Sequence, residues 1–260
     1  MKDLKEIRLF CLDMDGTIYL EQTLLPQVKE TLAHLKKQAQ ILFLTNNSSK
    51  SAKDYVEKLK KLGIDISLDE IYTSGQATCE YLYQHYPHQS VYLVGTDALK
   101  EEFEKHHIPL EDKNPDLVVL GYDTTLTYQK LVLCTTFLNQ GKPYIATHPD
   151  INCPATPYYV PDIGSMMALI EKSTNRTPDF ICGKPYTIMG KTIMEKFHLK
   201  PHQIAMVGDR LSTDIAFAKN NGFTAILVLS GETTLNQYQN QDIKADFVFA
   251  SIADLLTYLP

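Results

Sequence analysis

IRLFCLDMDGT, residues 7–17, joins a short apolar run to a cluster of polar residues. The run from Ile7 to Leu12 has the length and composition of a buried strand, and the polar residues follow directly at its end. Similar runs recur along the chain at spacings that leave room for one helix between them. This alternation is typical of a parallel sheet with crossover helices, so we predict an α/β fold.

Several runs of this kind predict the strands of one sheet. They are Ile7–Leu12, Ile41–Thr45, Glu70–Thr73, Ile204–Val207 and Ala225–Leu229. Pro26 suits the first turn of a helix, and Val28, Leu32 and Leu35 follow it at helical spacing. A second helix is predicted over residues 50–62, with a glycine next in the chain as its stop signal.

A second series of strands and helices lies between about Cys79 and Pro178. Its predicted strands are Val91–Val94, Leu117–Gly121 and Tyr144–Thr147, and its predicted helices are Asp97–His106 and Thr127–Gln140. We therefore predict two domains. One is a Rossmann-like parallel-sheet core of residues 1–78 and 179–260, and the other is an inserted α/β cap domain of residues 79–178.

Composition and charge exclude several classes of protein. The 25 Lys and Arg residues stand against 31 Asp and Glu, a net charge of −6, so a nucleic-acid partner is not expected. No apolar run approaches the roughly 18 residues that a membrane span needs, and the charged N-terminus lacks the apolar region of a secretory signal. Five cysteines without a CxxC pair favour reduced thiols. We expect a cytoplasmic protein that does not bind membranes.

The polar residues after the first strand suit a metal site. Asp13 and Asp15 can converge on one metal if the first offers its carboxylate and the second its backbone carbonyl, which leaves the second side chain free for proton transfer. Gly16 lets the chain turn sharply. The alternative is a turn rich in aspartate that caps a helix.

The second predicted strand ends in Thr45-Asn46-Asn47-Ser48-Ser49, at the start of a predicted helix. The first N–H groups of a helix lack internal partners, so such a place binds anions. The alternative is ordinary capping of the helix by Asn or Ser.

Two later motifs add one lysine and two carboxylates. Lys184 lies in Gly-Lys-Pro, where the alternative is a solvated surface charge. Asp209 follows the predicted strand Ile204–Val207 after one glycine, and Asp214 comes five residues later. Oxygen ligands of this kind suit Mg²⁺, although acidic residues also favour a helix N-terminus on their own.

The charge of these motifs implies a cation. Asp13, Asp15, Asp209 and Asp214 carry four negative charges against the one positive charge of Lys184. A phosphate dianion cannot approach such a cluster unaided, so a divalent cation is implied if the residues act together on phosphate.

The order of DMDGT, LTNNS, GKP and GDRLSTD resembles the four motifs of the haloacid dehalogenase superfamily of phosphatases. The segments TNNSS, ATHPD, IGSMMALIE, GKP, VGDRLSTDI and VLSGETT are similar to its NagD-like, 4-nitrophenylphosphatase-like branch, which carries a large α/β cap between the second and third motifs. The resemblance spans nearly the whole chain.

The resemblance implies a route through a phosphoaspartate. Asp13 would attack phosphorus, and Asp15 would protonate the leaving oxygen and then activate water. Thr45 would bind the phosphoryl group, and Lys184 would orient Asp13. Mg²⁺ would lie on the Asp13 carboxylate, the Asp15 carbonyl and Asp209.

The resemblance also names residues around this centre. Asp214 would anchor Lys184 or a metal-bound water, and Ser212 stands where many relatives have aspartate. His148 replaces a common asparagine. The residues expected to bind substrate are Thr45, Asn46, Asn47, His148 and Lys184.

Residues 148–162 hold four prolines and little periodicity, so we predict a long functional loop. Within it, His148, Asp150, Asn152 and the stretch 158–162 are expected to set substrate preference. His106 and His107 point to different faces of a predicted helix, so we predict no shared metal there.

The function implied by the resemblance is Mg²⁺-dependent hydrolysis of a small phosphorylated metabolite, such as a nucleotide or sugar phosphate, by a phosphoric monoester hydrolase. A phosphomutase or phosphotransferase would use the same intermediate, and a non-catalytic phosphate sensor would use the same fold. Caps of this type often dimerise in the family, which leaves a homodimer open.

Overall fold

A computed structural model describes residues 3–155 and 157–259 of the chain, which divide into two compact units. The core unit comprises the described parts of residues 1–45, 55–72 and 184–260. The cap unit comprises the described parts of residues 46–54 and 73–183. The short segment 46–54 therefore packs with the cap unit, whereas the sequence-based division assigned it to the core.

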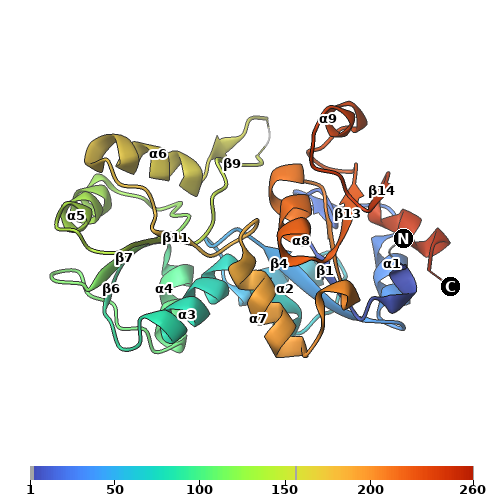
Figure 1. Cartoon of the computed structure of the whole chain (residues 1–260), viewed down its shortest axis with the longest axis horizontal. Helices are drawn as coiled ribbons and strands as arrows, with labels where there is room; N and C mark the ends of the chain where they lie inside the picture. The colour runs from blue at the N-terminus through green and yellow to red at the C-terminus, as the bar shows by residue number, and fades with distance from the viewer. Residues whose placement is uncertain (1–2, 156, 260) are drawn as a thin grey trace. The chain divides into compact units, whose positions relative to one another are not determined.

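The core unit is built on a six-stranded sheet in the order β14-β13-β12-β1-β4-β5 (Figure 1). Its strands are β1 (Leu9–Leu12), β4 (Gln40–Thr45), β5 (Ile71–Thr73), β12 (Ile204–Gly208), β13 (Thr224–Val228) and β14 (Phe247–Phe249). The pairings from β14 through β4 are parallel. The predicted α/β fold with a parallel-sheet core is confirmed.

The helices of the core unit lie mostly between these strands in the chain. They are α1 (Val28–Leu35), α2 (Ala52–Lys61, which starts in the cap unit), α7 (Thr187–Phe197), α8 (Ala216–Asn221) and α9 (Leu235–Gln239). Short helical turns are η1 (Leu4–Glu6), η2 (Leu68–Glu70), η3 (Pro201–Gln203), the π-helical η4 (Leu211–Ile215) and η5 (Ile252–Thr257). A small hairpin is formed by β2 (Tyr19–Leu20) and β3 (Thr23–Leu24).

The strand order places the carboxyl ends of β1, β4 and β12 next to one another. Strands β1, β12 and β13 are buried at every position, as expected of parallel strands covered on both faces. Strand β1 pairs with β4 on one side and with β12 on the other, with Leu12 opposite both Phe43 and Val207. The connections therefore change direction at β1, and ligands of such sheets bind at the carboxyl ends of the strands at this point.

The cap unit has a four-stranded parallel sheet in the order β11-β8-β7-β6. Its elements are α3 (Ser74–His85), β6 (Val91–Val94), α4 (Asp97–Lys105), β7 (Leu117–Leu120), α5 (Tyr128–Asn139), β8 (Tyr144–Ala146), α6 (Ile163–Thr174) and β11 (Phe180–Ile181). Helices α5 and α6 pack together, as do α3 and α4, and Figure 1 shows the two pairs on opposite sides of the sheet.

The predicted loop 148–162 contains a short hairpin. Strands β9 (Asn152–Cys153) and β10 (Val160–Pro161) pair antiparallel within it. Two residues per strand give too little periodicity for a sequence signal, so the structure corrects the prediction of an entirely irregular loop. Among the described residues, no helix has both the length and the apolar character of a membrane span.

Candidate active site

The candidate active site is built at the carboxyl ends of β1, β4 and β12. Asp13 directly follows β1, and its backbone N–H donates to the carbonyl of Val207 in β12 over 2.9 Å. Thr45 is the buried last residue of β4, and Asp209 follows β12. Parallel pairing therefore brings predicted residues from distant parts of the sequence to one edge of the sheet.

Lys184 is a buried ammonium held between two carboxylates. Only 2% of its side chain is exposed, and its Nζ donates to Asp13 Oδ1 over 2.7 Å and to Asp214 Oδ1 over 2.6 Å. Burial alone would lower the pKa of Lys184, but the charges of Asp13 and Asp214 outweigh it and raise that pKa above its ordinary value. Lys184 therefore carries a positive charge at neutral pH and is not the solvated surface lysine of the alternative interpretation.

Asp209 adds a third carboxylate to the two that contact Lys184. Oxygens of Asp13, Asp209 and Asp214 all lie within 4.8 Å of one another. Burial and then the charge of Asp214 raise the pKa of Asp209 to about 7. Burial and the same carboxylates also raise the pKa of Asp13, against the lowering effect of Lys184. The raised pKa values therefore reflect burial first and then repulsion among the carboxylates, both of which a bound cation would offset.

Asp209 fits a metal ligand in its remaining contacts. Its Oδ2 accepts the backbone N–H of Glu232 over 2.7 Å, while its Oδ1 is buried without a hydrogen-bond partner among the described atoms. A buried carboxylate oxygen without a partner is unfavourable in a folded protein unless a cation binds it. The donors here are carboxylate oxygens, which suit a hard divalent ion.

Two glycines make room for the carboxylate of Asp209, because neither has a side chain that would fill that space. A Cβ on Gly16 would lie 2.3 Å from Asp209 Oδ2, and one on Gly231 would lie 2.0 Å from the same atom. Gly16 also has φ of +83°, a left-handed conformation that other residues rarely adopt. Both the close approach and the turn therefore require glycine at position 16.

The structure brings Asp13, Lys184 and Asp214 into direct contact and places Asp209 beside them. The side chain of Asp15 is exposed, unlike that of Met14 before it. Ser212 is also exposed, on the π-helical turn η4. The individual roles predicted for these residues stay predictions.

Asn46, Asn47 and His148 belong to the cap unit. Asn46 Nδ2 donates to Asp150 Oδ1 over 3.0 Å, and Asn47 Oδ1 accepts the backbone N–H of Ser49 over 2.9 Å. His148 is fully buried, with both ring nitrogens in hydrogen-bond contact. Substrate binding by these three residues stays a prediction, and the burial of His148 favours the different role argued below.

Several contacts of the site were not predicted from the sequence. Ser230 Oγ donates to the carbonyl of Gly16 over 2.7 Å, the Glu232 N–H binds Asp209, and the Arg210 N–H donates to Asp214 Oδ2 over 3.1 Å. The segment VLSGETT was noted only for its family similarity. The donors of Arg210 and Glu232 are backbone N–H groups, which any residue type supplies, so those two residue types gave no signal.

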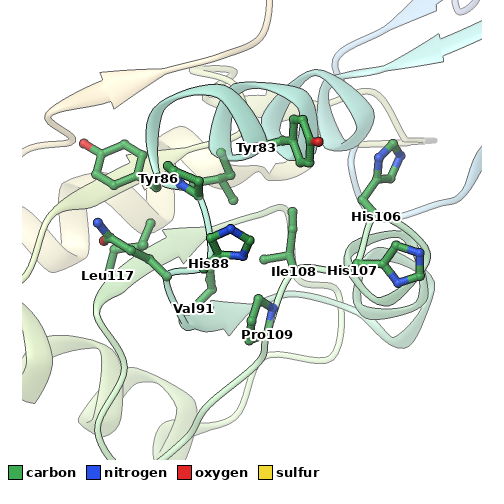
Figure 2. Close-up of a pocket in the computed structure, with 12 residues that line it drawn as sticks. Tyr83, Tyr86, His88, Val91, His106, His107, Ile108, Pro109 and Leu117 are labelled. Carbon is green, nitrogen blue, oxygen red and sulfur yellow. The ribbon is translucent and has the colours of Figure 1, made fainter.

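A separate pocket of about 320 Å³ lies within the cap unit. Figure 2 shows Tyr83, Tyr86 and His88 around the apolar side chains of Val91 and Ile108. His106 and His107 also line it. The prediction of no shared metal at His106 and His107 stays a prediction.

Comparison with known proteins identifies the family. A model described as haloacid dehalogenase-like hydrolase matches residues 10–109, and a second model for HAD-like hydrolases matches residues 181–255. An acid sugar phosphatase of Staphylococcus aureus is 31% identical over 98% of this chain and 99% of its own length. The chain belongs to the haloacid dehalogenase-like hydrolases.

Solved structures of related proteins identify the branch of the family to which the chain belongs. A 4-nitrophenylphosphatase from Thermotoga maritima is 47% identical, covers 99% of both chains and superposes with a TM-score of 0.96. A glycerol phosphate phosphatase from Mycobacterium tuberculosis, in complex with magnesium, is 25% identical over 98% of this chain and 78% of that one, with a TM-score of 0.91. The chain is a phosphatase of the NagD and 4-nitrophenylphosphatase branch, as its motifs predicted.

The space around Asp209 gives a test of the site. Gly16→Ala should lower phosphatase activity by at least about 10-fold, because the new Cβ displaces a carboxylate and small misplacements in active sites are expensive. Gly141→Ala is the matched control, since Gly141 has nearly the same φ of +82° but nothing within 4 Å of its Cβ position. The control should lose only about 1 kcal/mol of stability in urea unfolding. Equal losses of activity in both variants would contradict this account of Gly16.

Proposed function

We propose that this phosphatase hydrolyses small phosphomonoesters, with sugar phosphates as the preferred class, using Mg²⁺ and a phosphoaspartate on Asp13. The observation that carries the proposal is the contact of Asp13 Oδ1 with the buried ammonium of Lys184, at 2.7 Å. The substrate class rests on relatives named acid sugar phosphatase, glycerol phosphate phosphatase and 4-nitrophenylphosphatase. The substrates that these names indicate share only the phosphomonoester group.

Asp13 is the nucleophile in this proposal. One of its oxygens forms a bond to phosphorus as the bond from phosphorus to the leaving oxygen breaks, and Asp15 gives that oxygen a proton. Asp15 then takes a proton from water, the resulting hydroxide attacks phosphorus, and the Asp13 carboxylate is released with inorganic phosphate. The exposed position of Asp15 supports this role, since a proton carrier must exchange with solvent.

Lys184 keeps Asp13 ready for attack. The ammonium fixes the orientation of one carboxylate oxygen and offsets the negative charge that approaches with the substrate. Asp214 shares the ammonium and holds it from the other side. Thr45, at the end of β4, would bind a phosphoryl oxygen through its hydroxyl.

Mg²⁺ would be held by the carboxylates of Asp13 and Asp209 and by the backbone carbonyl of Asp15. The buried, unpartnered Oδ1 of Asp209 and the raised pKa of Asp209 support this ligand set. When bound, the ion offsets the repulsion between the carboxylate and the phosphate dianion. The glycerol phosphate phosphatase has been solved in complex with magnesium and in complex with calcium, which supports a divalent cation at this site.

The cysteines support a reducing compartment. None of the five, all within the described residues, forms a disulfide, and four of them are buried. A cytoplasmic location is therefore part of the proposal. A homodimer stays a prediction.

The substrate class and the role of Asp15 are tested together. We expect the enzyme to release phosphate from sugar phosphates and glycerol phosphate without transferring it to a second hydroxyl, which separates hydrolysis from the phosphomutase alternative. Asp15→Asn should lower kcat on sugar phosphates by roughly 10² to 10⁴, and less on 4-nitrophenyl phosphate, whose leaving group needs little protonation. Equal losses on both substrates would contradict the acid-base role.

The covalent intermediate is tested on Asp13. Asp13→Asn should lower kcat by more than about 10³-fold, because the amide is not a nucleophile. Acid quenching of the wild-type enzyme during turnover should trap a phosphorylated peptide that contains residue 13. Asp242→Asn, at an exposed carboxylate of the core unit, should leave the rate unchanged. Phosphate trapped on another residue would exclude this mechanism.

Metal removal tests the cation. Chelation by EDTA should abolish activity and Mg²⁺ should restore it, whereas Ca²⁺ should support little rate because its looser coordination misplaces the nucleophile. Asp209→Asn should raise the Mg²⁺ concentration for half-maximal activity by at least about 10-fold, as loss of supporting metal contacts does elsewhere. Full activity in metal-free buffer would remove the ion from the proposal.

A further inference from the structure

The chain crosses between its two units at four peptide bonds, and two of these adjoin the active site. One crossing lies between Thr45 and Asn46, and another between Gly183 and Lys184. The direct neighbours of the predicted phosphoryl-binding residue and of the buried lysine therefore belong to the cap unit. A third crossing lies just before Thr73, which precedes Ser74.

Within the cap unit, residues from these three crossings meet at the end of β8. The Gly183 N–H donates to the carbonyl of Thr147 over 2.7 Å. Ser74 Oγ donates to the carbonyl of Asn46. Ser48 Oγ lies 2.9 Å from Thr147 Oγ1 and accepts the Tyr122 N–H over 2.9 Å.

His148 completes this network. Its Nδ1 lies 2.9 Å from Thr147 Oγ1, and its Nε2 lies 3.1 Å from Asp162 Oδ1. Asp162 in turn caps helix α6, because the same oxygen accepts the N–H of Ile163 over 2.6 Å. The side chains of Ser48, Thr147, His148 and Asp162 are all buried, so each polar atom depends on the others for its partner.

The four side chains are linked from the carboxylate outward. A carboxylate only accepts, so His148 Nε2 carries the proton toward Asp162. Thr147 Oγ1 lies within hydrogen-bond distance of both His148 Nδ1 and Ser48 Oγ, and a hydroxyl can donate to one of them and accept from the other. A change at His148 would therefore alter the hydrogen bonds of Thr147 and, through Thr147, those of Ser48.

Gly183, the last residue before the chain returns to the core unit, is packed so closely that it leaves no room for a side chain. A Cβ on Gly183 would lie 2.7 Å from both His148 Cβ and the Thr147 carbonyl oxygen, and 2.8 Å from Asn46 Oδ1. The residue before Lys184 thus lies directly against the residue after Thr45 and against His148.

We propose that His148 is a positioning residue, which fixes Asn46–Ser48, Ser74 and Gly183 to one another and thereby sets the placement of Thr45 and Lys184. The inference rests on the proposed function for its kinetic consequences. It differs from the expected contact of His148 with substrate, because both ring nitrogens are already engaged and the ring is buried. A positioning residue affects every substrate alike, whereas a substrate contact discriminates between leaving groups.

The variants that test it are Thr147→Val, which removes the central hydroxyl at nearly constant shape, and His148→Gln, which keeps one donor and loses the ring. The matched control is His106→Gln, at the other imidazole–carboxylate contact of the cap unit, where Nε2 lies 3.2 Å from Glu102 Oε1. We expect kcat of the first two variants to fall by a factor on the order of 10 to 10², equally on a sugar phosphate and on 4-nitrophenyl phosphate, with KM little changed. The control should keep the wild-type kcat.

Amide hydrogen exchange gives a readout independent of catalysis. The N–H groups of Gly183 and Tyr122 should exchange faster in both network variants than in the wild type or in His106→Gln. Unequal losses on the two substrates, or a lower melting temperature with unchanged kcat, would overturn the proposal. If the wild-type enzyme did not hydrolyse phosphomonoesters, only the proposed function would be refuted. If the Gly183 N–H exchanged at the same rate in the network variants as in the wild type, the positioning role of His148 would be refuted in either case.

Discussion

A buried ammonium between two carboxylates is the interaction on which the rest of the core unit depends. Lys184 Nζ is almost completely shielded from water, and an unpaired charge in that place would be strongly unfavourable, so Asp13 and Asp214 must both reach it. Asp13 reaches it because β1 ends beside β12, and Asp214 because the π-helical turn η4 follows β12 closely. π-Helical turns are rare in proteins, and those that occur are often found at functional sites. Both the strand order and the π-helical turn are therefore needed to bring the two carboxylates to Lys184.

The carboxylates near Lys184 leave an excess of negative charge in the site. Three carboxylates lie within 4.8 Å of one another, and one lysine cannot balance them. Burial and mutual repulsion raise the pKa of Asp209 and of Asp13, which a bound cation would lower. Gly16 and Gly231 do not add charge, but they make the room that lets Asp209 approach. The shape of the site and its charge are therefore both consistent with a divalent cation.

Much of the fold and of the site could be predicted, and the failures have physical causes. Apolar runs such as Leu9–Leu12 are buried strands whatever surrounds them, so β1 and the polar residues at its end were found. The two-residue strands β9 and β10 are too short for periodicity, and they form because pairing fixes them. The contact of Glu232 N–H with Asp209 uses a backbone donor, which no residue type reveals. The packing of residues 46–54 with the cap unit depends on contacts distant in sequence, such as that of Ser48 with Thr147.

The two units each hold a buried polar network, and the networks differ in what satisfies them. In the core unit, the charged carboxylates of Asp13 and Asp214 share one ammonium, whereas in the cap unit the side chains from Ser48 to Asp162 are joined by hydrogen bonds. The hydrogen bonds of the cap unit hold together backbone segments that are distant in the sequence. The networks adjoin through the peptide bonds after Thr45 and before Lys184. The network of the cap unit can therefore hold the residues next to Thr45 and Lys184 in place, as the positioning role proposed for His148 requires.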